Sequence, residues 1–317
     1  MISSQDYIEA FNTYKRLTSN FPGIDDIVQC GTVKNPGISD IDTILIIDNW
    51  NSFKPSIQLL NPERISPLFT HGPFICEKSS LSKLSQFSTL RIQNSNYSNL
   101  YSTKVDNASL LAITLIRQTR AFLHFNSIKK RLFDLKDRHI LLLANSLKHS
   151  FSDLQGVELL QESGKYVFFL EILNKLNSIM IKGVSLNKYD INILINHMHE
   201  HIELGIEILS SALAEQLSMC KIDYGARKRT VLLSWFQTNI NRDEFYFNNQ
   251  DNNIFINTIY KWNKFYNDMV DGHNESGAFA KGAEFIFMNH KISRYQLFSR
   301  RLIKRSNRIF RLSLSVL

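Results

Sequence analysis

Apolar residues recur at intervals of three and four along the chain from Asn107 onward. This spacing puts one apolar stripe along the side of a helix, and a folded protein buries that stripe against its core. No proline occurs in this part of the chain, so no residue there removes a helical hydrogen bond in the way that proline does. The pattern predicts six or more helices. The apolar groups lie at residues 110–122, 141–147, 168–176, 191–209 and 231–236.

The first hundred residues follow a different pattern. Ser3 or Ser4 can cap a helix that has apolar residues at helical spacing. This helix ends before Pro22. Short runs rich in Ile, Val and Leu then predict strands at residues 27–30 and 41–47, joined by a polar turn. Further strands are predicted at residues 73–77 and 88–94.

Together the two patterns predict an α+β protein, with a small mixed sheet and its helices followed by a larger all-helical domain. The period and the composition change near residue 105. We therefore expect a first domain at residues 1–105, a helical domain at residues 106–290 and a basic amphipathic C-terminal segment at residues 291–317.

The net charge of +8 is concentrated at one end of the chain. Residues 285–317 contain eight basic residues and neither Asp nor Glu, so they account for the whole excess. Apolar residues alternate with the basic clusters, as in an amphipathic helix. Such a segment either docks on an anionic membrane surface or on RNA, or packs as a last helix with a solvated basic side. The concentration of charge favours docking.

The overall composition is typical of a globular chain, with 44% hydrophobic and 21% charged residues. Cys30, Cys76 and Cys220 are far apart, so neither a disulfide framework nor a structural zinc site is expected. The first residues do not form a signal-peptide pattern, and no apolar run is long enough to span a membrane. We expect a cytoplasmic protein, peripheral to the inner membrane face if its basic segment docks there.

Two carboxylates, Asp40 and Asp42, lie at the start of an apolar run in the sequence CGTVKNPGISDIDTILII. Side chains alternate along an extended chain, so the two point to the same side, roughly 6–7 Å apart. Carboxylates this close repel each other unless solvent or a cation lies between them, and Mg²⁺ prefers oxygen ligands. Gly31 lets a backbone approach a phosphate, and Gly37 permits a positive φ in the turn. The other interpretation is a solvated strand end with ordinary turn glycines.

The order of these elements resembles the signature of the DNA polymerase beta-type nucleotidyltransferase superfamily, including its minimal bacterial members. In that superfamily a Gly-Ser or similar turn precedes a strand that carries Asp-x-Asp. Here the turn is Gly31-Thr32 and the strand carries Asp40-Ile41-Asp42. The resemblance concerns the first 105 residues. It implies a nucleotidyltransferase-like sheet domain for that part of the chain.

The resemblance also implies the catalytic residues. Asp40 and Asp42 would bind Mg²⁺ and act in catalysis. The superfamily takes a third carboxylate from a later strand, where it helps to deprotonate the attacking hydroxyl and to hold a second metal ion. Glu77, at the end of the strand predicted at residues 73–77, is the candidate for this role.

By the same resemblance, four residues of the turn would bind the nucleotide. Gly31 and Thr32 would hold its phosphates, with Thr32 in place of the usual Ser and keeping the hydroxyl. Lys34 is either a triphosphate contact or a solvated loop lysine. Ser39, directly before the Asp pair, completes the set.

The implied function is Mg²⁺-dependent transfer of a nucleotidyl group from ATP or another nucleoside triphosphate to an acceptor hydroxyl. The acceptor and the preferred base are not specified by the residues. The alternative is an inactive nucleotidyltransferase-like protein that binds a nucleotide or a partner. A third carboxylate near Asp40 and Asp42 would favour the enzyme.

His197 and His201 lie four residues apart in a stretch predicted to be helical. This spacing places both on one face, where they could bind a transition metal ion. No further residue completes a recognisable zinc motif. A polar helix surface is therefore the preferred interpretation.

Overall fold

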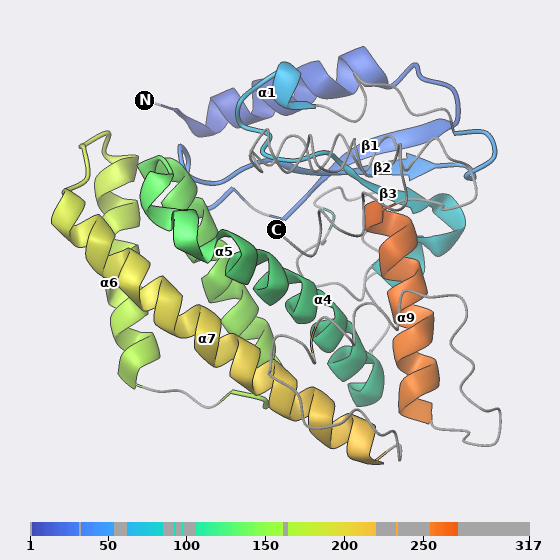
Figure 1. Ribbon diagram of the computed structural model, residues 1–317. Helices are drawn as coiled ribbons and strands as arrows, with labels where there is room; N and C mark the ends of the chain where they lie inside the picture. The colour runs from blue at the N-terminus through green and yellow to red at the C-terminus, as the bar shows by residue number, and fades with distance from the viewer. Residues whose placement is uncertain are drawn as a thin grey trace, which may run out of the picture. The chain divides into compact units, whose positions relative to one another are not determined.

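The computed structural model of the 317-residue chain describes residues 2–31, 33–53, 62–84, 92, 97, 106–160, 164–219, 233 and 254–271 (Figure 1). The chain divides into two compact units. Gln5–Thr32 and Asp40–Tyr101 belong to one, the sheet unit; Val33–Ser39 and Ser102–Asn267 belong to the other, the helical unit. The predicted α+β class, a small mixed sheet followed by helices, is confirmed.

The sheet unit is built on three strands, β1 (Ile24–Cys30), β2 (Asp42–Ile47) and β3 (Phe74–Glu77). Strand β2 lies in the middle, antiparallel to β1 and parallel to β3. All residues of β2 after Asp42 are buried, because a central strand is covered on both faces. The sequence places β2 and β3 to within one residue of their observed bounds.

Strand β1 begins three residues before the predicted start, and it includes the acidic pair Asp25-Asp26. Each carboxylate forms an ion pair within the sheet unit. Asp25 lies 2.7 Å from Lys78, and Asp26 lies 2.7 Å from Lys15 and accepts a hydrogen bond from the hydroxyl of Tyr97. These partners offset the cost of placing two acidic residues in a strand.

Helix α1 (Ser4–Thr18) runs along one face of the sheet in Figure 1. It buries Tyr7 and Tyr14 completely, and the ring of Tyr14 lies 5.4 Å from that of Phe69, in the loop before β3. The helix therefore covers the sheet with aromatic side chains and also holds the loop that leads into β3.

Short elements complete the described part of the sheet unit. They are the 3₁₀ turns η1 (Pro62–Arg64) and η2 (Lys78–Ser80) and the one-turn helix α3 (Leu81–Leu84). Ile92 forms an antiparallel bridge with Cys30. It is the one described residue of the strand predicted at residues 88–94, and the rest of that strand lies outside the described residues.

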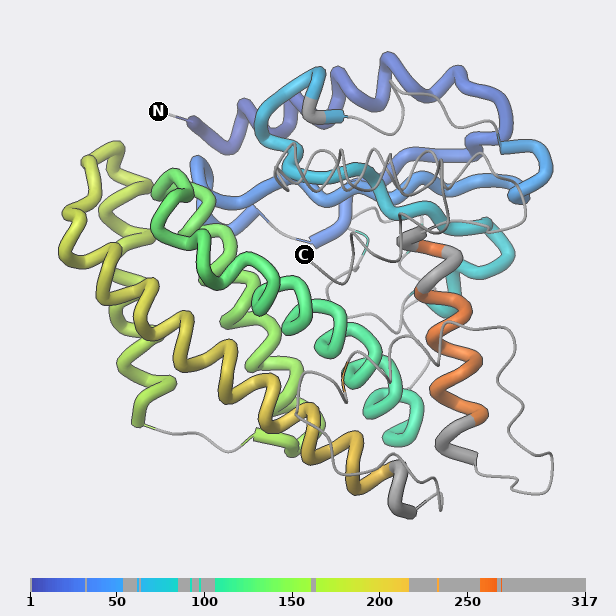
Figure 2. Tube along the Cα trace, viewed as in Figure 1, coloured from blue at the N-terminus to red at the C-terminus, as the bar shows by residue number. Residues whose placement is uncertain are grey.

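The helical unit contains α4 (Asn107–Ile128), the 3₁₀ turn η5 (Lys129–Asp134), α5 (Asp137–Gly156), α6 (Gly164–Ile181), α7 (Lys188–Met219) and most of α9 (Ile254–Asp271) (Figure 2). Helix α7 packs against α4, α5 and α6. Asp106 caps α4 and accepts a hydrogen bond from the backbone N–H of Ser109. No helix among the described residues is long and apolar enough to cross a membrane.

Two predicted segments fall on residues that the structure does not describe. Of the helix predicted at residues 231–236, the structure describes Leu233, which is buried. The basic segment at residues 291–317 lies outside the described residues altogether.

A glycine sets how closely α7 approaches α4. A Cβ atom at Gly205 would lie only 1.9 Å from Cε1 of Phe122 and 2.2 Å from its Cζ. Phe122 is completely buried and makes edge contacts with the rings of Phe125 and Phe151, so it has no free space to move into. Glycine at this position is therefore a packing requirement, although glycine is a poor helix former.

We expect Gly205→Ala to destabilise the protein, because overpacking a filled core costs roughly 1–3 kcal/mol and outweighs the gain in helix propensity. Gly156→Ala is the matched control, since a Cβ atom there meets nothing within 4 Å. Urea denaturation should show a lower midpoint for Gly205→Ala and an unchanged or higher midpoint for Gly156→Ala. Equal midpoints for the two variants would contradict the packing described here.

Candidate metal centre

Asp40 and Asp42 meet a third side chain, His71, at one edge of the sheet. Asp42 is the first residue of β2, where it pairs with Cys30 of β1, and Asp40 lies two residues earlier. One ligand atom from each of the three side chains lies within 4.8 Å of the other two. Within the described residues, this is the one group of three that could hold a metal ion.

The parallel pairing of β2 with β3 explains why these residues meet. Ile44 pairs with Phe74, so the residues that lead into the two strands lie at the same edge. The backbone N–H of Ile41 also donates to the carbonyl of Leu68, which extends the alignment into the preceding loop. His71, three residues before Phe74, is thereby brought beside Asp42, 29 residues away along the chain.

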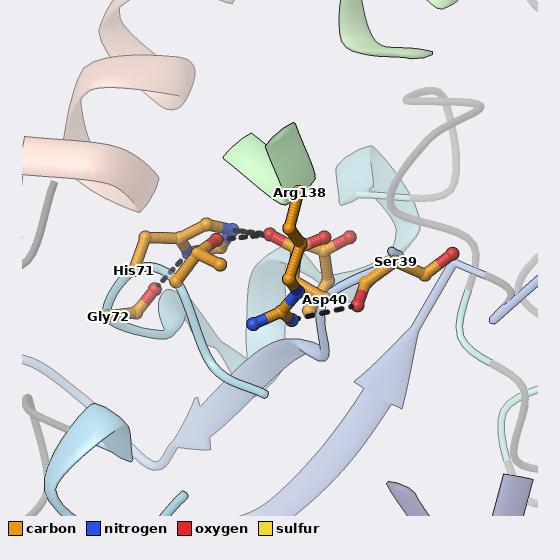
Figure 3. Close-up of polar contacts among 7 residues, drawn as sticks. Ser39, Asp40, His71, Gly72 and Arg138 are labelled. Atoms are coloured by element: carbon orange, nitrogen blue, oxygen red, sulfur yellow. Dashed lines mark hydrogen bonds and ion pairs between the residues drawn. The ribbon is translucent and has the colours of Figure 1, made fainter. Parts of the chain in front are cut away.

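The imidazole of His71 is held between a carboxylate and a backbone carbonyl. Its Nε2 lies 2.7 Å from Oδ1 of Asp42 and 4.0 Å from Oδ2 of Asp40. Its Nδ1 lies 2.6 Å from the carbonyl oxygen of Gly72, as Figure 3 shows beside Asp40. A carbonyl can only accept, so Nδ1 carries a hydrogen and Nε2 is the nitrogen that faces the two carboxylates.

Burial and mutual repulsion shape the charges of this group. The pKa of Asp40 is raised by burial and by the charge of Asp42, although His71 and the hydroxyl of Thr70, which donates to Asp40, act in the opposite direction. Burial would lower the pKa of His71, but its hydrogen bond to Asp42 and the two carboxylate charges outweigh this and raise the pKa to about 9. The three groups therefore attract a cation, whether a proton or a metal ion.

Glu77 does not join this group. It pairs with Ile47 at the far end of β2, five residues beyond Asp42 along the ladder, which is roughly 16 Å at the usual rise of a strand. Its carboxylate instead accepts a hydrogen bond from the backbone N–H of Trp50. The two parallel strands begin at one edge of the sheet and end at the opposite edge. Asp40 and Asp42 lie where β2 begins and Glu77 lies where β3 ends, so the structure does not bring Glu77 to the two aspartates.

His71 is the residue that sequence reasoning missed. It precedes the strand predicted at residues 73–77 in the same way that Asp40 precedes the strand predicted at residues 41–47. A parallel arrangement of these two strands would have placed them at one edge. The sequence carries no sign of that arrangement other than the length of the connection between the strands.

Gly37 adopts the positive φ that the sequence suggested, and Gly31 has a positive φ as well. Gly31 directly follows β1 with φ 68°, and Gly37 has φ 87°. Other residues rarely adopt such angles, so both positions favour glycine. Gly31 directly follows Cys30, which pairs with Asp42, so the backbone beside Asp42 carries no side chain at this position.

The other nucleotide-binding candidates, Thr32, Lys34 and Ser39, are not part of the described sheet unit. Thr32 is outside the described residues. Lys34 and Ser39 belong to the segment Val33–Ser39 of the helical unit. There the hydroxyl of Ser39 accepts a hydrogen bond from the backbone N–H of Asn35, and its carbonyl accepts one from Arg138 at 3.4 Å (Figure 3).

His201 is not part of a polar helix surface, so that interpretation of the His197–His201 pair is wrong for this residue. Only 2% of its surface is exposed. Its ring lies 4.8 Å from that of Phe169 and close to two more aromatic rings, those of Phe151 and Tyr166. Its Nδ1–H donates to the carbonyl of His197, and its Nε2 has no hydrogen-bond partner among the described residues.

Comparison of the chain with protein-family models, curated proteins and solved structures gave no match. The resemblance carried by Gly31, Asp40 and Asp42 therefore stays a prediction. What the structure adds to it is the geometry of the three side chains at the edge of the sheet.

The burial of His201 leads to a pH prediction. Burial lowers the pKa of His201 below the usual value of 6.5, and the nearby charge of Lys165 acts in the same direction. Below about pH 6.5 the unfolded chain binds a proton that the folded protein resists, so stability should fall as the pH falls. The contribution of one such group is at most about 1.4 kcal/mol per pH unit.

Urea denaturation at pH 7.5, 6.5 and 5.5 measures this dependence. His124 and His149 also have pKa values lowered by burial and act in the same direction as His201, whereas His71, with its raised pKa, acts in the opposite direction. His201→Phe should reduce the slope between pH 6.5 and 5.5, because one of these groups is removed. An identical slope in this variant would show that His201 does not resist protonation.

Proposed function

We propose that the protein transfers a nucleotidyl group from a nucleoside triphosphate to an acceptor hydroxyl, with the help of a divalent metal ion. The observation that carries the proposal is the convergence of Asp40, Asp42 and His71 at the start of a central buried strand. The glycine turn at Gly31 and the resemblance of this region to nucleotidyltransferases support it. Mg²⁺ is the ion that the two carboxylates suggest.

Each residue has a definable part in such a reaction. Asp40 and Asp42 would hold the metal ion, and the hydroxyl of Thr70 orients Asp40. The bound ion would neutralise charge on the phosphate oxygens and on the attacking hydroxyl. Gly31 would let the backbone approach the phosphates.

The chemistry that these residues would support is an in-line displacement. The acceptor hydroxyl attacks the α-phosphorus and gives up its proton to water, a new oxygen–phosphorus bond forms, and pyrophosphate leaves with the electrons of the broken bond. The protein contributes position and charge, so alignment of the acceptor with the leaving group decides the rate.

A protein that binds a nucleotide without reacting it is the second candidate. The position of Glu77 favours it, because no third carboxylate joins Asp40 and Asp42 within the part of the chain that the structure describes. Such a protein would show metal-dependent triphosphate binding but no release of pyrophosphate.

We expect the double variant Asp40→Asn/Asp42→Asn to lose metal-dependent triphosphate binding and to keep its fold, because the amides remove the charge that attracts the ion. Thermal melting with each of the four nucleoside triphosphates and Mg²⁺ measures this. A triphosphate at a hundred times its dissociation constant stabilises the native state by about 2.7 kcal/mol. The wild-type midpoint should therefore rise clearly, and that of the double variant should not.

Glu77→Gln is the matched control, since it removes a carboxylate at the far end of the same strands and keeps an oxygen that can accept from Trp50. It should bind triphosphate like the wild type. Wild-type binding by the double variant, or equal loss in Glu77→Gln, would contradict the assignment of the site. A pyrophosphate assay on the wild-type protein then separates the enzyme from the binding protein.

A further inference from the structure

We propose that His71 is a metal ligand, and that it makes the centre formed with Asp40 and Asp42 bind a divalent first-row transition metal ion in preference to Mg²⁺. The inference rests on the metal centre of the proposed function and does not require nucleotidyl transfer. The kind of donor atom that each of the three side chains presents determines which ion they prefer.

The donor atoms of the three side chains lie close together at the edge of the sheet. The Nδ1–H of His71 donates to the carbonyl of Gly72, so Nε2 is the ring nitrogen that faces the carboxylates. A metal ion bound there would take the place of the hydrogen that Nε2 donates to Asp42. This nitrogen is 2.7 Å from one oxygen of Asp42 and 4.0 Å from one of Asp40. Three lone-pair donors therefore converge on one small volume.

Hydrogen bonds to neighbouring residues hold His71 and Asp40 in place. Histidines that bind a metal ion almost always donate their other ring N–H to a carbonyl, a carboxylate or water, which fixes the ring. Gly72 provides this contact for His71, and the ring of Phe74 meets the imidazole at 5.5 Å. The hydroxyl of Thr70 holds Asp40 in a comparable way. None of these three residues belongs to the donor set itself.

The donor atoms of the centre determine which metal ion it prefers. Imidazole nitrogen suits zinc, iron, nickel and copper, whereas Mg²⁺ prefers oxygen and gives up its water reluctantly. A transition metal ion can bind well to one nitrogen and two carboxylate oxygens, whereas for Mg²⁺ the nitrogen is an unsuitable donor and weakens binding. Three protein ligands also leave coordination positions for water or a phosphate oxygen, as in catalytic metal sites.

Direct titration of the full-length protein without nucleotide tests the inference, with Co²⁺ and Mg²⁺ as the two probes at pH 7.5. Calorimetry gives both affinities, and the visible absorption of Co²⁺ reports a change in its coordination. We expect Co²⁺ to bind at least about tenfold more tightly than Mg²⁺, following the order of affinities for sites with nitrogen donors. The Co²⁺ spectrum should change on binding.

Two substitutions of His71 isolate its contribution. His71→Asn replaces the nitrogen donor with an amide oxygen, so it should weaken Co²⁺ binding by about tenfold or more and leave Mg²⁺ binding little changed. His71→Ala should weaken Co²⁺ binding at least as much, and thermal melting checks the fold of each variant. His199→Asn is the control, because His199 lies in the helical unit with its Nε2 against the carbonyl of Lys129.

The outcomes distinguish the two proposals. Equal affinities for Co²⁺ and Mg²⁺, or Co²⁺ binding that His71→Asn does not weaken, would overturn the role of His71 and leave a carboxylate site for Mg²⁺ intact. Tight Co²⁺ binding through His71 in a protein that binds no triphosphate would uphold this inference and contradict the proposed function. Binding of neither ion would remove the metal centre and both proposals with it.

Discussion

The parallel pairing of β2 with β3 is the constraint on which the candidate metal centre depends. Parallel strands begin at the same edge, so the segments that lead into them are neighbours even when 29 residues separate them. The hydrogen bond from Ile41 to Leu68 extends that alignment beyond the strands. Asp40, Asp42 and His71 meet there, while Glu77 is carried to the opposite edge by the same pairing.

Local patterns in the sequence predict much of the fold. Apolar spacing indicates the helices because it reports burial along one face of a single element. The strands β2 and β3 are equally clear, since both are continuous apolar runs beside turn residues. The side shared by Asp40 and Asp42 also follows from alternation along an extended chain. All these features are fixed by residues close to one another in sequence.

Features that depend on distant partners could not be predicted in this way. His71 joins the carboxylates only through strand pairing, which no local pattern reports. Strand β1 includes Asp25 and Asp26 because lysines from other elements neutralise them. His201 resembles a surface residue in sequence, but three aromatic rings from α5 and α6 enclose it. In each case a contact between elements decides the environment of a polar side chain.

Anomalous X-ray scattering from crystals of the full-length protein soaked in Mn²⁺ tests most directly whether Asp40, Asp42 and His71 hold a metal ion together. We expect a peak within about 2.0–2.3 Å of one oxygen of Asp40, one oxygen of Asp42 and Nε2 of His71, as for divalent ions bound by such donors. A peak absent from this edge of the sheet, in crystals where Mn²⁺ binds elsewhere, would contradict it. So would an ion bound by the carboxylates with the imidazole turned away.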